Sequence, residues 1–412
     1  MDMTRKGFVD SMVMAAGGLC AGCASSGKPA FGGSDRFSWG CLLHLGSNMW
    51  DDFENGPDDW AKSEEEERQR PNPFGPSGNR RSSYHSYLRC HDDLWRKSVD
   101  HAAKKGLDLV FIDLGEGIEY PSHPELKVAG TWSVDKIRKE LARMRRLGLE
   151  PCPKLNFSAC HDSWLKDYHR MLSTRKYYQV VADVIRDAVE IFDNPRLFHI
   201  GYDEEMAIAE FNHFHVTVRQ GDLWWHDLFY TVDQVSRHGS RPVMWADAIW
   251  TGRREYTRRM TKDVLQSNWY YRSDFSENKL KWNYEFEKKG GWGETVNGAA
   301  AFQALEDAGF DQLPCTSNWA DDGSADAVVK YCREHIDPSR LKGFYTAPWM
   351  QTVPDTPEKK SISATLSGLD LLAAARDRHY PRIPPVRQIE RTLFGSWCFH
   401  CVRQKLDTFL KG

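Results

Sequence analysis

The residues best suited to chemistry in this 412-residue sequence are three consecutive carboxylates, Asp203, Glu204 and Glu205. They follow a short apolar run, residues 197–200, and the turn residue Gly201. Such a run ending at a glycine is typical of a buried parallel strand. Enzymes built on parallel barrels carry their catalytic groups where the strands end. Neighbouring carboxyls there can differ in environment, so that one is ionised while the other keeps its proton near neutral pH. The structural alternative is a solvated acidic loop that opens the next helix.

The elements that must position these groups alternate regularly along the chain. Apolar runs predict eight strands, at residues 37–45, 107–114, 150–157, 197–200, 241–245, 263–267, 312–317 and 342–347. Capped or amphipathic stretches predict helices at 91–105, 133–148, 174–192, 223–235, 295–309 and 359–375. No hairpin signal separates the strands. A doubly wound open sheet would normally have a glycine-rich phosphate turn after its first strand, and this sequence has none. We therefore predict an α/β fold, a (β/α)8 TIM barrel, rather than that open sheet.

The barrel is predicted to form a single catalytic domain over residues 35–380. A polar stretch at residues 50–90, after the first strand, is too long for an ordinary connection and is predicted to be an insertion. Residues 381–412 are predicted to form a helical extension that packs on the barrel.

Residues 1–34 have the pattern of a bacterial export signal followed by a flexible tether. A basic pair at positions 5 and 6 precedes a short apolar stretch, which resembles a twin-arginine signal peptide and is too short to span a bilayer. Cys23 follows a sequence that resembles a lipoprotein cleavage site. We expect an exported bacterial protein, periplasmic or at the cell surface, whose membrane contact is a lipid anchor at Cys23.

Composition argues against several partners and cofactors. With 55 basic and 58 acidic residues and a net charge of −3, the chain lacks the basic surplus of proteins that bind nucleic acid or membrane surfaces. The pair Cys398 and Cys401 is a lone CxxC, which favours two buried thiols or a local disulfide over metal or redox chemistry. His161 and His199 could join carboxylates around a divalent ion, but no HxxxH spacing supports this. We predict neither a metal nor a cofactor.

The residues that follow the predicted strands should surround one cleft, because a barrel brings the carboxyl ends of its strands to one face. Several of the sixteen tryptophans lie there, where flat rings suit stacking on sugars; packing at the barrel mouth is the alternative for each. Paired carboxylates in an aromatic cleft suit glycoside hydrolysis, so the predicted partner is a carbohydrate. The residues expected around Asp203 and Glu204 are Glu116, His161, Asp162, His199, Trp245, Asp247, Trp269, Tyr270, Tyr271, Trp319, Trp349 and Gln351.

The stretch from His199 to Glu204, His-Ile-Gly-Tyr-Asp-Glu, resembles the His-x-Gly-Gly-Asp-Glu signature of glycoside hydrolase family 20, the β-N-acetylhexosaminidases. Trp245 is similar in place to the tryptophan of the family's fifth strand, and Trp349 to one of its pocket aromatics. The resemblance covers residues 36–380.

Four departures from the family pattern accompany this resemblance. Tyr202 stands in place of the second signature glycine, and the first predicted strand has no arginine to grip sugar hydroxyls. Gln351 stands where the family has a glutamate after the strand-eight tryptophan. We also expect the chain to lack the small domain that usually precedes the family's barrel. These departures make the acid pair a firmer prediction than the identity of the sugar.

The resemblance implies removal of β-linked N-acetylhexosamine by a retaining, substrate-assisted mechanism. Glu204 would act as the general acid and then as the base. Asp203 would orient the substrate's 2-acetamido group, whose carbonyl oxygen is the nucleophile. Tyr270 or Tyr271 would support the developing oxazoline, and His199 would brace the site by hydrogen bonding.

Two alternatives remain open at this stage. Glu204 could serve as the acid on a sugar without an acetamido group, with another carboxylate such as Asp247 as nucleophile or base. The chain could instead be a non-catalytic barrel that binds carbohydrate at the cell surface. The adjacent pair Asp203 and Glu204 argues against the second alternative, because a binding protein has no need of it.

Overall fold

The computed structural model describes residues 36–51, 84–207, 209–210, 213, 216–289, 293–357 and 359–381. The predicted export segment with Cys23, most of the predicted insertion, and the C-terminal extension with Cys398 and Cys401 lie outside the described residues. No helix in the described part of the chain combines the length and the apolar composition needed to cross a membrane.

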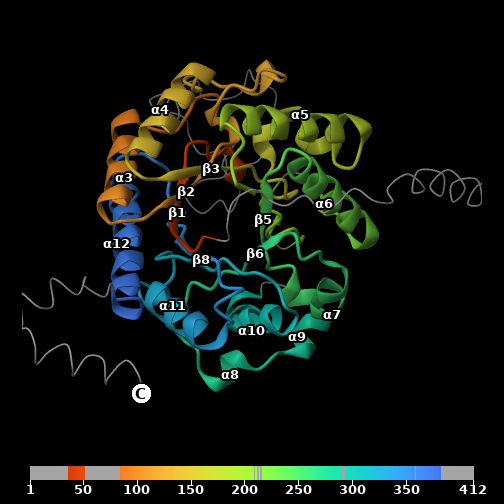
Figure 1. Cartoon of the computed structure of the whole chain (residues 1–412). Coiled ribbons are helices and arrows are strands. Elements are labelled where there is room, and N and C mark those ends of the chain that lie inside the picture. The colour runs from red at the N-terminus through yellow and green to blue at the C-terminus, as the bar shows by residue number, and fades with distance from the viewer. Residues whose placement is uncertain are drawn as a thin grey trace, which may run out of the picture.

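Eight parallel strands of the described chain form a barrel (Figure 1). The strands are β1 (Ser38–His44), β2 (Leu109–Asp113), β3 (Glu150–Lys154), β4 (Leu197–His199), β5 (Arg241–Trp245), β6 (Leu265–Ser267), β7 (Cys315–Thr316) and β8 (Gly343–Thr346). Hydrogen bonds join them in the order β6-β5-β4-β3-β2-β1-β8-β7. Isolated pairings of Gln266 with Gln312 and of Trp269 with Cys315 close the remaining gap between β6 and β7. The predicted TIM barrel is confirmed, and the open doubly wound sheet is excluded.

Helices surround the strands (Figure 1). The long ones are α3 (Asp92–Lys104), α4 (Val134–Arg146), α5 (Arg175–Ile191), α6 (Gly221–Ser236), α7 (Ile249–Arg259), α10 (Ala299–Asp307), α11 (Ser324–His335) and α12 (Ile362–His379). Short turns of helix complete the connections: η1 (Asn48–Trp50), η3 (Gly115–Gly117), η4 (Pro124–Leu126), η5 (Ser163–Met171), α8 (Glu277–Leu280), α9 (Tyr284–Lys289) and η6 (Glu294–Gly298). The helices predicted to start at residues 133 and 174 are both capped there, since Ser133 accepts the Lys136 N–H and Thr174 accepts the Tyr177 N–H.

Two of the long helices, α7 and α11, are not among the predicted ones. Gly252 interrupts α7 with non-helical dihedral angles, and much of the rest of that helix is charged, so it shows little apolar periodicity. Helix α11 does carry an apolar stripe with the spacing i, i+3, i+4 and i+7, which the sequence could have revealed: Ala325, Val328, Val329 and Cys332.

The inside of the barrel holds a buried ionic cluster as well as apolar side chains. The Nζ atom of Lys154, at the end of β3, donates to the Asp113 carboxylate at 2.5 Å, and His44 Nδ1 lies 3.4 Å from the same carboxylate. Burial disfavours the charged form of Asp113, but Lys154 and His44 outweigh it and lower the pKa of that carboxyl. The His44 ring in turn lies 4.5 Å from the ring of Trp50 and 5.7 Å from that of Trp349. The cluster therefore supports aromatic rings at the carboxyl ends of the strands.

Candidate active site

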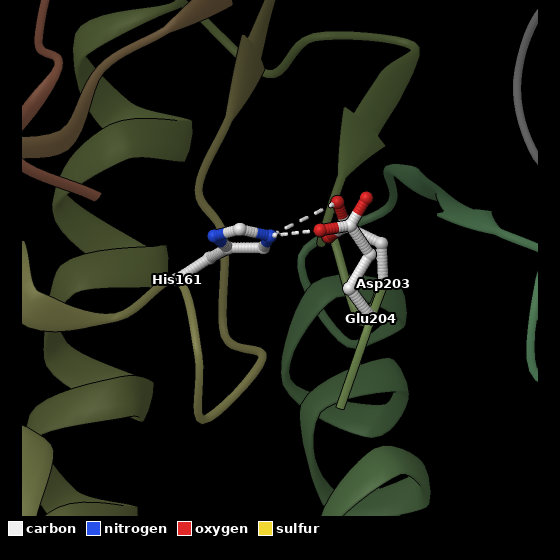
Figure 2. Close-up of side chains that lie close together, drawn as sticks. All are labelled: His161, Asp203 and Glu204. Atoms are coloured by element: carbon white, nitrogen blue, oxygen red, sulfur yellow. Dashed lines mark hydrogen bonds and ion pairs between the residues drawn. The ribbon is translucent and has the colours of Figure 1, made fainter. Parts of the chain in front are cut away.

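Asp203 and Glu204 follow β4 in a backbone turn that L-residues rarely adopt. The φ angle is +73° at Gly201, +68° at Tyr202 and +58° at Glu204. Positive φ strains residues other than glycine and persists only where surrounding contacts impose it. Here the Glu204 N–H donates to Asp247 Oδ2 at 2.9 Å. The turn directs the side chains of Asp203 and Glu204 toward the same point (Figure 2).

His161, in the loop after β3, lies at that point and faces both carboxyls (Figure 2). Its Nε2 atom is 3.2 Å from Glu204 Oε2 and 3.6 Å from Asp203 Oδ2. The Nδ2 group of Asn156 donates to Asp203 Oδ1 at 2.8 Å, so the second carboxylate oxygen is left to face His161. Burial disfavours the charged imidazole, but the neighbouring Cys160, Asp203 and Glu204 raise the pKa of His161 well above its usual value. At neutral pH His161 is therefore a hydrogen-bond donor to the acid pair.

The third carboxylate, Glu205, turns away from His161 and has a different role. It forms a buried ion pair with Arg219 at 2.5 Å and accepts the Ala159 N–H at 3.1 Å. Ala159 belongs to the loop that carries His161, and Glu205 directly follows Glu204. The hydrogen bond from Ala159 thus ties the loop after β3 to the loop after β4, and the ion pair with Arg219 holds the Glu205 carboxylate in place to accept it.

A cavity of about 470 Å³ opens in front of the acid pair, a volume typical of small-molecule sites. Trp269 and Tyr271 stack along it, with ring centres 4.9 Å apart. The ring of Trp349 lies 6.4 Å from the rings of Trp50 and Tyr271. The cavity is lined by Trp50, His161, Asp203, Glu204, Trp269, Tyr271, Arg272, Glu294, Trp319, Trp349 and Lys359. A larger groove of about 630 Å³ between α3 and α4 contains none of these residues, and some of its charges pair with one another, as Lys136 does with Asp92 and Arg143 does with Glu140.

Five of the residues predicted around the acid pair line this cavity: His161, Trp269, Tyr271, Trp319 and Trp349. Others lie beside or beneath it. Asp247 holds the backbone of Glu204, and Trp245 stacks on Tyr345 with its ring 5.6 Å from Trp349. His199 lies inside the barrel, where Nε2 is 3.2 Å from the hydroxyl of Tyr345, the bracing position expected of it. Gln351 is outside the lining and accepts a hydrogen bond from Lys359.

Three predicted site residues lie away from the cavity, which corrects their assignment to substrate binding. Glu116 is buried and accepts the backbone N–H groups of Ser47 and Asn48, so its carboxylate anchors the turn after β1. Asp162 is fully buried beside His169, at 3.5 Å, within the loop after β3. Successive side chains of an extended segment point to opposite sides, so Tyr270 points away from the cavity that Tyr271 faces. The Tyr270 hydroxyl donates to the Asp274 carbonyl instead.

Four cavity residues were not predicted: Trp50, Arg272, Glu294 and Lys359. Arg272 follows Tyr271 directly, so the strand-end rule could have found it. Trp50 falls within the predicted insertion, and Glu294 and Lys359 reach the cavity from segments far along the chain. Glu294 accepts the Tyr271 N–H at 2.9 Å, which fixes the backbone of that aromatic wall.

Asp247, which accepts the Glu204 N–H, has a strongly raised pKa. Burial and the nearby charge of Asp203 raise the pKa of Asp247 to about 8, against the hydrogen bond from the Glu204 N–H. It therefore keeps its proton at neutral pH. A neutral carboxyl at this position avoids a further negative charge beside Asp203.

The fold and the site define a class of protein, a (β/α)8 barrel with an acidic cleft walled by aromatic rings. No protein-family model matches the sequence, and no curated protein matches it. Among solved structures, the chain is similar to a catalytic module of glycoside hydrolase family 20 from the pneumococcal exo-β-D-N-acetylglucosaminidase StrH. The sequence identity is 12%, the TM-score is 0.50, and the match covers 90% of this chain and 92% of that one. The resemblance to family 20 therefore extends to the fold of the whole barrel.

Two further structures are similar over part of their length. The exo-β-N-acetylglucosaminidase from Vibrio harveyi is 14% identical, with a TM-score of 0.45 and a match over 71% of this chain and 55% of that one. The β-N-acetylhexosaminidase from Bacteroides fragilis is 11% identical, with a TM-score of 0.48 and a match over 81% of this chain and 65% of that one. The chain thus spans between about half and two thirds of these two proteins.

Replacing Gly201 by alanine should destabilise the protein more than its positive φ alone explains. A Cβ atom there would lie 2.1 Å from Asn156 Oδ1, the residue that holds Asp203. Gly239→Ala is the matched control, since φ is +84° there and nothing lies within 4 Å of the added atom. Both variants should lose about 1–2 kcal/mol to the backbone. Urea unfolding should show a further loss of about 1–3 kcal/mol in Gly201→Ala only; equal losses would contradict the close contact.

Asp247 should make stability depend on pH in a definite direction. Its folded pKa of about 8 lies above the ordinary value of 3.8, so between these values the unfolded chain releases a proton that the folded chain keeps. This group therefore lowers wild-type stability as pH rises, by at most about 1.4 kcal/mol per pH unit. Asp247→Asn lacks this effect. The free energies of unfolding of wild type and Asp247→Asn should be measured in urea at pH 5 and pH 8. Relative to wild type, the variant should be more stable at pH 8 than at pH 5. The same difference at both pH values would refute the raised pKa.

Proposed function

We propose that this protein is a glycoside hydrolase of the family 20 type that removes β-linked N-acetylhexosamine from a carbohydrate. The observation that carries this proposal is the convergence of Asp203, Glu204 and His161 on an aromatic-lined cavity at the carboxyl end of β4. The shared barrel fold and the resemblance of the strand-four sequence to the family signature support it. The similar StrH module belongs to a protein named as an exo-β-D-N-acetylglucosaminidase, which favours the same substrate class here.

Glu204 acts as the general acid and then as the general base. Its side chain is 21% exposed, so it reaches the cavity while its backbone is held by Asp247. It gives its proton to the glycosidic oxygen as the bond from C1 to that oxygen breaks. It then takes a proton from the water that attacks C1. His161, hydrogen-bonded to Oε2, keeps this carboxyl in a single orientation through both steps.

Asp203 orients the nucleophile, which belongs to the substrate. Asn156 holds Oδ1, and Oδ2, which lies 3.6 Å from His161 Nε2, accepts the N–H of the 2-acetamido group with its remaining lone pair. The acetamido carbonyl oxygen attacks C1 from the face opposite the leaving group, and the positive charge of the resulting oxazolinium ion is stabilised by Asp203. Two displacements at C1 retain its configuration.

The aromatic walls bind the sugar ring and exclude water. Trp269, Tyr271 and Trp349 present flat apolar faces to the cavity, which suit the C–H face of a pyranose. Burial raises the pKa of Tyr271 well above its usual value, so its hydroxyl stays protonated and can donate a hydrogen bond. We assign to Tyr271, rather than Tyr270, the support of the acetamido oxygen.

A panel of aryl glycosides tests this function. The panel pairs 4-nitrophenyl N-acetyl-β-glucosaminide and -galactosaminide with their 2-hydroxy counterparts. Wild type should hydrolyse only the acetamido sugars, and Asp203→Asn should lower kcat by about 10²- to 10³-fold. Glu204→Gln should lose less on a nitrophenyl glycoside than on a disaccharide, because a good leaving group needs less protonation. Glu125→Gln, outside the cavity lining, is the control and should keep full activity.

The other outcomes of this panel contradict the proposal in distinct ways. Hydrolysis of the 2-hydroxy sugars would transfer the role of nucleophile to a protein carboxylate such as Asp247. Sugar binding without turnover of any substrate would replace the enzyme with a carbohydrate-binding barrel.

We also propose that the protein is exported and held to a bacterial membrane by a lipid on Cys23. The proposal rests on the sequence pattern of residues 1–34. Cys23→Ser should move the protein from the membrane fraction to the soluble fraction of the producing cell without changing its activity. Membrane association equal to that of wild type would contradict the anchor.

A further inference from the structure

We infer that His161, Asp203 and Glu204 form a binding site for one divalent transition-metal ion, and that the chemistry of the donors selects Zn²⁺. Bound zinc would occupy the carboxyls that the glycoside needs and so inhibit the enzyme reversibly. The inhibition rests on the proposed function, whereas the metal site rests only on the geometry of the three side chains.

The distances from His161 to the two carboxylates match the spacing of ligands around a tetrahedral ion. With zinc–ligand bonds of about 2.0–2.1 Å, two ligands of a tetrahedral zinc lie about 3.3 Å apart. His161 Nε2 lies 3.2 Å from Glu204 Oε2 and 3.6 Å from Asp203 Oδ2. All three residues offer a donor atom within 4.8 Å of the others. Figure 2 shows the imidazole nitrogen pointing at both carboxyls, so an ion that displaces the proton on Nε2 can bind with little movement of the side chains.

Surrounding contacts hold the ligands in place. Asn156 donates to Oδ1 of Asp203, which leaves Oδ2 available to the ion. The Glu204 backbone is bonded to Asp247, and His161 is buried with 5% of its surface exposed. Ligands that are already ordered lose little conformational freedom on binding, which favours affinity.

The fourth coordination position is open to solvent. The three side chains line the cavity of about 470 Å³, so a water molecule can complete the tetrahedron. Three protein ligands and one water are the usual arrangement of zinc sites that face a cleft. One imidazole and two carboxylates also suit Zn²⁺ better than Mg²⁺ or Ca²⁺, which prefer six or more oxygen ligands.

Another histidine of the described chain contacts two carboxylates but lacks this geometry. His123 meets Glu125 through Nδ1 at 2.9 Å and Asp183 through Nε2 at 3.3 Å. Because the two carboxylates lie on opposite sides of the ring, one ion cannot bind all three residues. Within the described residues, His161, Asp203 and Glu204 are the one group of three or more such donors close enough to share an ion.

A bound ion would remove the chemistry assigned to Glu204. Coordination takes the lone pair of Oε2 and keeps the carboxyl deprotonated, so it cannot give a proton to the glycosidic oxygen. The ion also occupies the side of Asp203 assigned to the acetamido group. Zinc should therefore compete with the substrate, and a chelator should restore activity.

Titration of the full-length, chelator-treated protein with ZnCl₂ by isothermal calorimetry tests the site. Wild type should bind one equivalent of zinc. His161→Gln and Glu204→Gln should bind it at least about tenfold more weakly. His123→Gln is the matched control and should bind as wild type does. Zinc held elsewhere, by cysteines for example, is common to all four proteins and cancels in the comparison. Substitution with Co²⁺ gives an independent signal, the visible absorption of tetrahedral cobalt, which His161→Gln should lack.

Equal zinc binding by wild type and His161→Gln would overturn the inference, as would equal binding of MgCl₂ and ZnCl₂ by wild type. If His161→Gln does not fold, the near-isosteric Glu204→Gln and Asp203→Asn carry the same comparison. Zinc should raise the apparent KM for an aryl N-acetyl-β-glucosaminide without changing kcat, and EDTA should reverse this. Hydrolysis that persists unchanged when zinc is saturating would overturn the inference and leave the proposed function intact. Zinc binding that depends on His161 in a protein without hydrolase activity would overturn the proposed function and leave the metal site.

Discussion

The site depends on the close approach of the backbone at Gly201 to the side chain of Asn156. An atom added at Gly201 would lie 2.1 Å from Asn156 Oδ1, so only glycine allows the two segments to pack this closely. That approach lets Asn156 bond Asp203, and the following turn with positive φ directs Glu204 to the same side. The strain of the turn is held by contacts on both sides, the Glu204 N–H with Asp247 and the Tyr202 hydroxyl with Thr231.

The concentration of carboxyls at the end of β4 raises an electrostatic problem, because buried like charges repel and desolvation disfavours each of them. The structure resolves it differently for each group. Asp203 and Glu204 face the imidazole of His161, Glu205 pairs with Arg219, and Asp247 keeps its proton. Carboxyls that are close in space therefore serve separate purposes: two face the cavity, one ties loops together and one supports the backbone.

The same arrangement connects the proposed chemistry with the inferred metal site. A carboxyl that donates a proton and then accepts one, and a carboxylate that must bind an amide group, both need an oxygen atom facing the cavity. An imidazole placed to orient them adds a nitrogen donor at the ligand spacing of zinc. Groups ordered for catalysis are thus also ordered for a cation, and occupation by substrate or by metal excludes the other.

The sequence by itself determined the barrel and the position of the acid pair. Strand runs and helix starts are local patterns, so the eight strands and the helices that start at Ser133 and Thr174 could be predicted; α7 could not, because Gly252 breaks its periodicity. Only the tertiary structure decided which side chains face the cavity. Tyr270 and Tyr271 are equivalent in the sequence, but the structure turns Tyr270 away from the cavity. Glu116 resembles a site carboxylate in the sequence, but in the structure it accepts the backbone N–H groups of Ser47 and Asn48. Side-chain direction depends on contacts between residues far apart in the chain, which no local pattern records.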